Sequence, residues 1–246
     1  MKHIIYLLVL ISSLALTSCA HYYYAPNTAN VPLISEKNEV RVTGAYAAGR
    51  ESQFEGGELQ AAYGITNHLG VQLNGFSAGR TENTGDYDES GKGIYAEAAA
   101  GYFTKFKGSN KWIAELYGGI GKGSVTNDYG LGDHSKVGIT KLYLQPAIGF
   151  KSKNFEIAVT PKISYIHWKV KDAMLITNHA PDINLDLDHI RQNPGHLAFE
   201  PALIIRGGLK NVKIQFAWSF TNLDKNSQSS GLAETENASV GLSVNF

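Results

Sequence analysis

The residues with the most chemical potential in this 246-residue chain are charged side chains set within otherwise apolar stretches. Most of them lie between apolar neighbours, so in an extended strand the charges share one face. If that face is enclosed, the charges must pair, because buried charge is tolerated only when it is paired and hydrogen-bonded. The set is Arg41, Glu58, Glu97, Lys105, Glu115, Lys141, Glu156, Lys162, Glu200, Arg206 and Lys213. Five acids and six bases predict an internal network of ion pairs, and a narrow gated pore is the functional alternative.

A second group of carboxylates and imidazoles lies in the polar segment 169–195 and at its borders. Its members are His167, Asp172, His179, Asp182, Asp186, Asp188, His189 and His196. Carboxylate and imidazole ligands together suit a divalent metal ion. No spacing among them matches a known calcium or zinc loop, however, so we interpret the segment as a solvated surface loop. The sequence predicts no metal, no cofactor and no catalytic residue.

Ten stretches with a period of two residues position these side chains. They cover residues 40–46, 58–63, 69–74, 94–105, 112–120, 141–150, 155–165, 197–206, 212–220 and 238–246. One face of each stretch is apolar and the other is polar, which is the pattern of strands with one wholly apolar face. That face contacts lipid in a transmembrane barrel and forms the core of a soluble sandwich. We predict an all-β, ten-stranded antiparallel up-and-down transmembrane β-barrel, with a lipid-tethered soluble β-sandwich as the alternative.

The connections between these stretches alternate between short turns and long loops. Short turns are expected at residues 67–68, 107–110, 152–154 and 207–211, and long polar loops around 50–56, 80–92, 126–137, 169–195 and 222–235. Transmembrane barrels sort their connections in this way, with short periplasmic turns and long external loops. Loops 80–92 and 169–195 are the candidate contacts for an extracellular ligand. Pro146, Pro161 and Pro201 fall inside strands, and we expect each to mark a bulge.

The N-terminal region predicts export. Residues 1–18 combine a basic start with an apolar stretch and small residues, as signal peptides do. Leu16-Thr17-Ser18-Cys19 resembles a bacterial lipobox, which implies cleavage before Cys19 and acylation of that residue; cleavage after Ala20 is the alternative. Residues 19–37 have no period, and we interpret them as a lipid-anchored periplasmic linker before a barrel domain at 38–246. The 22 basic and 22 acidic residues balance, so the charge offers no sign of nucleic-acid binding.

These features together resemble the small outer-membrane β-barrel proteins of Gram-negative bacteria. The resemblance implies an outer-membrane location, contact with outer-membrane lipid, and a C-terminal signal for the barrel-assembly machinery. Val240, Leu242, Val244 and Phe246 match that signal. The expected role is structural or surface-interacting, and the alternative is a narrow diffusion channel.

A second resemblance is to the omptins, ten-stranded proteases with an Asp pair and an Asp-His pair at the outer rim. Asp86 and Asp88, with Asp186 or Asp188 and His189, are the residues that would carry such a role. The strands are shorter than in that family, and Asp188 and His189 are adjacent rather than one residue apart. We therefore expect no enzymatic activity.

Overall fold

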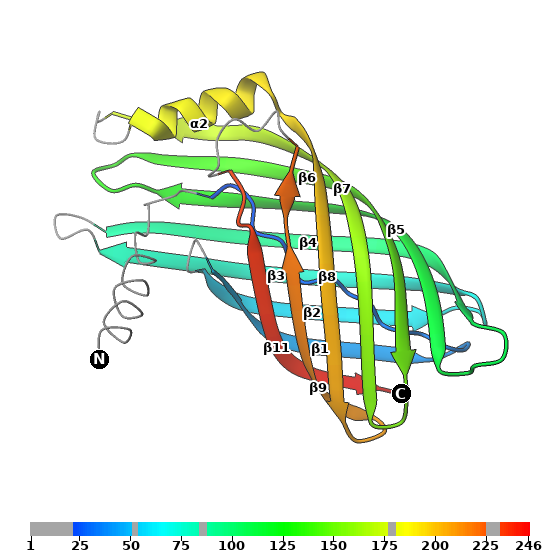
Figure 1. Ribbon diagram of the computed structural model, residues 1–246. Coiled ribbons are helices and arrows are strands. Elements are labelled where there is room, and N and C mark those ends of the chain that lie inside the picture. The colour runs from blue at the N-terminus through cyan, green and yellow to red at the C-terminus, as the bar shows by residue number, and fades with distance from the viewer. Residues whose placement is uncertain (1–21, 51–53, 84–87, 177–180, 225–231) are drawn as a thin grey trace, which may run out of the picture.

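The described part of the protein is a closed antiparallel β-barrel with one helix at its end (Figure 1). The computed structural model describes residues 22–50, 54–83, 88–176, 181–224 and 232–246. The strands are β1 (Val40–Gly49), β2 (Glu55–Gly64), β3 (Leu69–Asn83), β4 (Asp88–Lys105), β5 (Trp112–Asp128), β6 (His134–Lys151), β7 (Phe155–Met174), β8 (Gly195–Gly208), β9 (Val212–Phe220), β10 (Asn222–Leu223) and β11 (Glu236–Asn245). The helix is α2 (Pro181–Gln192).

Each strand pairs with its neighbours in the chain, and β11 pairs with both β9 and β1, which closes the ring. The two-residue β10 continues β9, because both pair with β8 in one register. The ring therefore has ten strands, and the predicted ten-stranded antiparallel barrel is confirmed. Closure rules out the sandwich alternative. No helix in the described residues is both long and apolar enough to cross a membrane.

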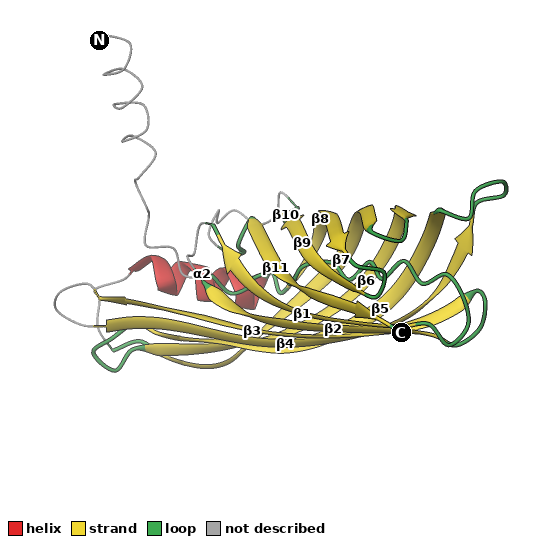
Figure 2. Cartoon of the chain, turned by 90° about the horizontal axis from the view of Figure 1, so that it is seen from below, coloured by secondary structure: helices red, strands yellow, loops and turns green. Residues whose placement is uncertain are grey.

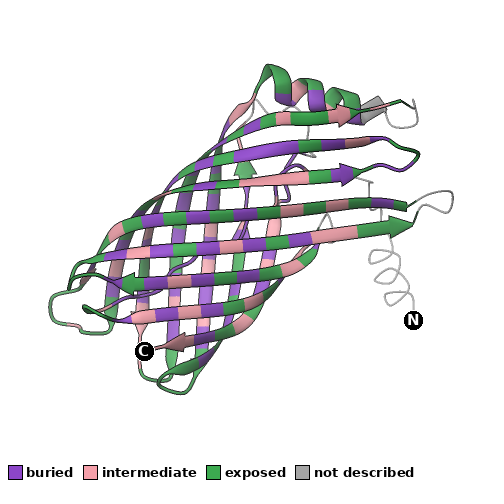
Figure 3. Ribbon diagram, turned by 180° about the vertical axis from the view of Figure 1, so that it is seen from behind, coloured by how far each residue is buried: buried purple, intermediate pink, exposed green. Residues whose placement is uncertain are grey.

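The period-two pattern of the sequence explains why these residues form a barrel. Buried and exposed residues alternate along the strands (Figure 3). The exposed positions are apolar: the side chains of Leu59, Leu73 and Ile94 are 60–63% exposed. The inward positions carry the charged and amide side chains, which are buried. The barrel is therefore apolar outside and polar inside, the reverse of a soluble domain.

Five consecutive strands, β3–β7, are longer than the others and form a tall wall at one side of the barrel (Figure 1). The long loops expected at 80–92 and 126–137 are instead mostly strand. β3 extends to Asn83 and β4 begins at Asp88, and β5 and β6 enclose only residues 129–133. Within the expected loop 169–195, β7 extends to Met174 and α2 follows it. The apolar Ile183, Leu187 and Ile190 recur at helical spacing, and all three are buried. Polar loops were expected here because the exposed faces of these elements carry polar residues.

The three strand prolines do not act as expected. The only register shift between β6 and β7 lies between Lys136 and Val137. The paired residues on either side of Pro146 and Pro161 keep one register, and Pro161 lies directly opposite Pro201. Pairing instead lapses locally around these residues, between Leu144 and Ile148 of β6. A missing N–H removes a ladder hydrogen bond without inserting a residue, which accounts for gaps rather than bulges.

Residues 22–35, which we call the plug, lie inside the barrel. Residues 26–34 are all buried, and in Figure 1 the dark-blue segment passes behind β11, β9 and β8. The plug begins at the end that carries the long connections, where Tyr23 N donates to Leu232 O. It ends beside the short turns, where Asn38 N donates to Gly64 O before β1 starts. Residues 22–35 of the segment that we expected to be a periplasmic linker, 19–37, therefore lie inside the barrel.

Figure 2 shows that α2 and the C-terminus lie at opposite ends of the barrel. We name these ends the loop side, which carries α2, and the turn side, which carries the short turns. The plug enters at the loop side and leaves at the turn side.

Candidate functional site: the plugged lumen

The upper ion-pair network, formed by Glu97, Lys141, Lys162 and Glu200, lies in the lumen toward the loop side. The Lys141 ammonium lies 2.8 Å from Glu200 Oε2 and 3.4 Å from Glu97 Oε1. Lys162 Nζ lies 3.1 Å from the same Glu97 oxygen. All four side chains are buried, so two acids and two bases neutralise each other away from water.

The plug completes this network with hydrogen bonds of its own. Tyr24 OH donates to Glu200 Oε1 and accepts from Lys141 Nζ at 2.6 Å. Asn27 Nδ2 donates to Glu97 Oε2 at 3.1 Å. Both acids thus have plug partners as well as lysine partners, and these contacts fix the upper half of the plug against β4, β6 and β8.

The lower ion-pair network surrounds Glu156. Arg41 binds this carboxylate with two donors, Arg206 Nη1 lies 3.2 Å from it, and Lys213 Nζ lies 3.3 Å from it. Three bases thus face one acid. Arg206 Nη2 also donates to Val31 O of the plug at 2.8 Å. The plug carbonyl therefore satisfies a donor that the carboxylate does not reach.

Two further lumen carboxylates bind plug backbone instead of a base. Glu58 Oε1 accepts from Thr28 N at 2.6 Å, and Glu115 Oε1 accepts from Ile34 N at 2.9 Å. In the opposite sense, Gln145 Nε2 donates to Asn30 O at 2.7 Å. An extended segment with free N–H and C=O groups needs such partners once it is buried. The wall and the plug satisfy each other's polar groups.

Each end of the plug has its own attachment. At the turn side, Glu39 accepts from Ser35 N at 2.7 Å and pairs with Lys151, whose Nζ donates to Leu33 O at 2.9 Å. At the loop side, the Tyr23 and Tyr129 hydroxyls lie 3.0 Å apart. Burial raises the pKa of both phenols, so they hydrogen-bond as neutral groups.

An apolar cluster covers the loop side of the plug. It includes Tyr23 and Trp168 and the three buried apolar residues of α2. Beside it, His196 Nδ1 lies 3.0 Å from Asp224 Oδ1, and its Nε2 lies 2.9 Å from Asn193 O. Both partners are acceptors, so this buried ring joins the end of α2 to the segment after β10.

Ten of the eleven predicted lumen residues are buried within the barrel. Lys105 differs: it is the last residue of β4, is exposed, and makes no ion pair with the described residues. Of the expected C-terminal signal residues, Val240, Leu242 and Phe246 are exposed. Phe246 N donates to Val40 O, which closes the seam between β11 and β1. Cys19 lies outside the described residues.

The described residues that we predicted at the rim and in the loops have different contact partners. Asp88 accepts from Asn83 Nδ2 at 2.7 Å, and Asp188 pairs with Arg191. The His189 ring lies 5.9 Å from that of His196. Asp86 and His179 lie outside the described residues. In the part of the chain that the structure describes, no three His, Cys, Asp or Glu side chains converge as a metal site would require.

The plug is the feature that sequence reasoning missed. Its signal was nevertheless present: no charged residue occurs between Tyr22 and Ser35. A solvated linker of this length would ordinarily carry charge.

Comparisons with known proteins give distant matches to solved structures. No family model and no curated protein matches the chain. Among solved structures, it is similar to the attachment invasion locus protein Ail of Yersinia pestis, with 15% identity over 85% of this chain and 99% of that one and a TM-score of 0.39. The outer membrane protease OmpT of Escherichia coli matches with 11% identity over 85% and 94%, TM-score 0.36. The translocator domain of the autotransporter NalP of Neisseria meningitidis matches with 11% identity over 87% and 89%, TM-score 0.38. At these identities and TM-scores, the matches support no conclusion about the fold or the activity of this protein.

Replacing Glu97 by Gln tests the upper network. The change preserves shape but leaves Lys141 and Lys162 with one carboxylate, so we expect a loss of about 3–5 kcal/mol in the free energy of unfolding. The readout is urea unfolding of the detergent-solubilised protein, followed by gel mobility without boiling. Asp188→Asn removes one carboxylate of an exposed pair, and there the expected loss is below about 1 kcal/mol. Equal losses in the two variants would contradict the network.

Proposed function

We propose that this protein is an outer-membrane β-barrel closed by its own N-terminal segment, with a structural or surface-interaction role and no enzymatic activity. The single observation that carries the proposal is the plug, which occupies the lumen and binds both ion-pair networks. A lumen filled in this way leaves no open path for solutes. It also leaves no unpaired acid and base arranged for catalysis among the described lumen residues.

The outer face of the barrel supports the membrane location. Large apolar side chains are exposed on every long strand, and aromatic residues such as Trp112, Phe155 and Phe246 lie near the turn side. Monomeric soluble proteins rarely expose continuous apolar surface of this extent. Outer-membrane lipid is therefore the proposed surroundings of this face. Insertion by the barrel-assembly machinery, read from Val240, Leu242, Val244 and Phe246, remains part of the proposal.

The loop side is the proposed interaction surface. The tall wall of β3–β7 and the helix α2 extend there, and their exposed residues include polar side chains together with Met174 and Leu185. The two segments first singled out, 80–92 and 169–195, belong to this wall and this helix. Because strands and a packed helix hold it in place, this surface is suited to a partner that recognises a fixed shape.

Deleting residues 22–34 tests whether the plug closes the lumen. In planar bilayers, the full-length protein should give no discrete current steps, because plug and ion pairs fill its interior. The deletion variant should give steps whose size scales with salt concentration. A heat-modifiable gel band establishes that the variant still folds as a barrel.

The same recording on Asp188→Asn, which leaves the plug intact, provides the matched control. Discrete steps of equal size from the full-length protein and the deletion variant would contradict the proposal. They would favour the diffusion channel.

We further infer that the lipid anchor, if formed on Cys19, holds the loop side and not the periplasmic side. The plug enters the barrel at the loop side, where the Glu234 N–H donates to Tyr24 O. Three residues span at most about 11 Å, so Cys19 is confined near Tyr22. Long connections face the outside in such barrels. This proposed orientation differs from the periplasmic anchor that we expected from the sequence.

An epitope tag inserted after Ala20 tests this orientation. We expect antibody to bind the tag on intact cells, because the plug runs inward from the outer surface. The same tag placed between Gly108 and Ser109, in the turn after β4, should bind antibody only after the outer membrane is permeabilised. The reverse pattern of accessibility would overturn the proposed orientation.

A further inference from the structure

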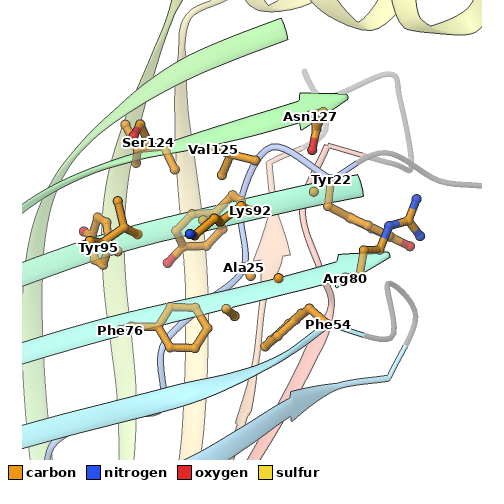
Figure 4. Close-up of a pocket in the computed structure, with 17 residues that line it drawn as sticks. Tyr22, Ala25, Phe54, Phe76, Arg80, Lys92, Tyr95, Ser124, Val125 and Asn127 are labelled. Carbon is orange, nitrogen blue, oxygen red and sulfur yellow. The ribbon is translucent and has the colours of Figure 1, made fainter. Parts of the chain in front are cut away.

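A narrow apolar pocket lies between the plug and the inner wall of β3, β4 and β5, near the loop side. The enclosed space within it is about 60 Å³. Figure 4 shows Phe54, Phe76 and Tyr95 along it, with Arg80 at the end nearest Tyr22. Neither ion-pair network includes these side chains. Binding sites for small molecules are commonly lined by apolar side chains with a few polar groups.

Missing side chains on the barrel wall create the space. Gly91 and Gly93 occupy inward positions of β4, and Ala78 occupies one of β3. A Cβ added to Gly93 would lie 3.6 Å from the nearest atom, Val125 Cγ2, which is ordinary contact. Close packing therefore does not demand glycine at position 93. Glycine there leaves a pocket that a larger residue would fill.

A cationic side chain at the pocket favours an anionic ligand. The Arg80 side chain is only 16% exposed, and its nearest carboxylate, that of Glu82, lies 3.7 Å away. That distance is too long for a hydrogen bond. Among the described residues the guanidinium has no other charged partner, although it carries five donors.

We propose that this pocket binds a small amphiphile with a short apolar chain and one carboxylate group. The chain lies among Phe54, Phe76, Tyr95 and Val125, and the carboxylate accepts two hydrogen bonds from Arg80, as planar carboxylates and guanidinium groups do. Tyr24 and Ala25 of the plug form the opposite wall. A bound amphiphile therefore contacts plug and barrel together and stabilises the plugged state.

The test uses decanoate and the full-length protein in lipid nanodiscs. Equilibrium dialysis with labelled decanoate, corrected for empty nanodiscs, should show saturable binding of one molecule per chain. Gly93→Leu fills the pocket, and it should lower the affinity at least about tenfold. Gly75→Leu adds the same side chain at an outward position with open space around it, and should leave binding unchanged. A heat-modifiable band shows that both variants are folded.

The charged end of the ligand is tested separately. Arg80→Gln should weaken decanoate binding by about tenfold and leave the binding of decanol unchanged, because only the carboxylate needs the guanidinium. Lys122→Gln removes a cation from the outer face and should change neither. Three results would overturn the proposal: no saturable binding above empty nanodiscs, equal binding by the two leucine variants, or equal loss of decanoate and decanol in Arg80→Gln.

Discussion

The structure depends on the cost of removing charge from water inside a narrow barrel. Ten of the eleven predicted lumen charges are buried, and each would be strongly destabilising without a partner. Five acids and five bases balance, yet they do not pair one to one: Glu156 has three bases, while Glu58 and Glu115 bind backbone N–H groups. The plug supplies the missing partners. The barrel wall and its N-terminal segment therefore satisfy each other's buried polar groups.

The need to pair these charges also explains how the plug, the apolar cluster and the pocket are arranged along the barrel. A plug that must reach both networks runs the length of the lumen, and an apolar cluster with α2 covers its entry. The tall wall of β3–β7 provides the surface for that cluster. The same wall is lined with glycine and alanine opposite Tyr24, which leaves the apolar pocket beside the plug. Closure, the covered loop side and the pocket thus follow from one threaded segment.

The period of two residues predicted the barrel, its ten strands and the inward set of charges. Those features follow from local alternation, which any one strand displays. The plug could not be predicted in the same way, because an extended segment that pairs with side chains has no period of its own. The sequence-based bounds of the long wall strands were too short for a related reason. Toward the loop side the outward residues of these strands become polar, as at Thr81 and Ser90. Lys105 lies at a position of β4 whose side chain alternation predicts an inward orientation. It is the last residue of the strand, however, and at the rim an inward position is not buried.

The most direct test of the account is a disulfide between the plug and the wall. Thr28 Oγ1 and Ser239 Oγ lie 3.1 Å apart, and both side chains are buried. With Cys19 replaced by Ala, the Thr28→Cys, Ser239→Cys pair should form an intramolecular disulfide in cells, detected by mass spectrometry of the linked peptides. The Thr28→Cys, Val240→Cys pair should not, because Val240 faces outward. Free thiols in the first pair, or equal linkage in both, would show that the N-terminal segment does not occupy the lumen.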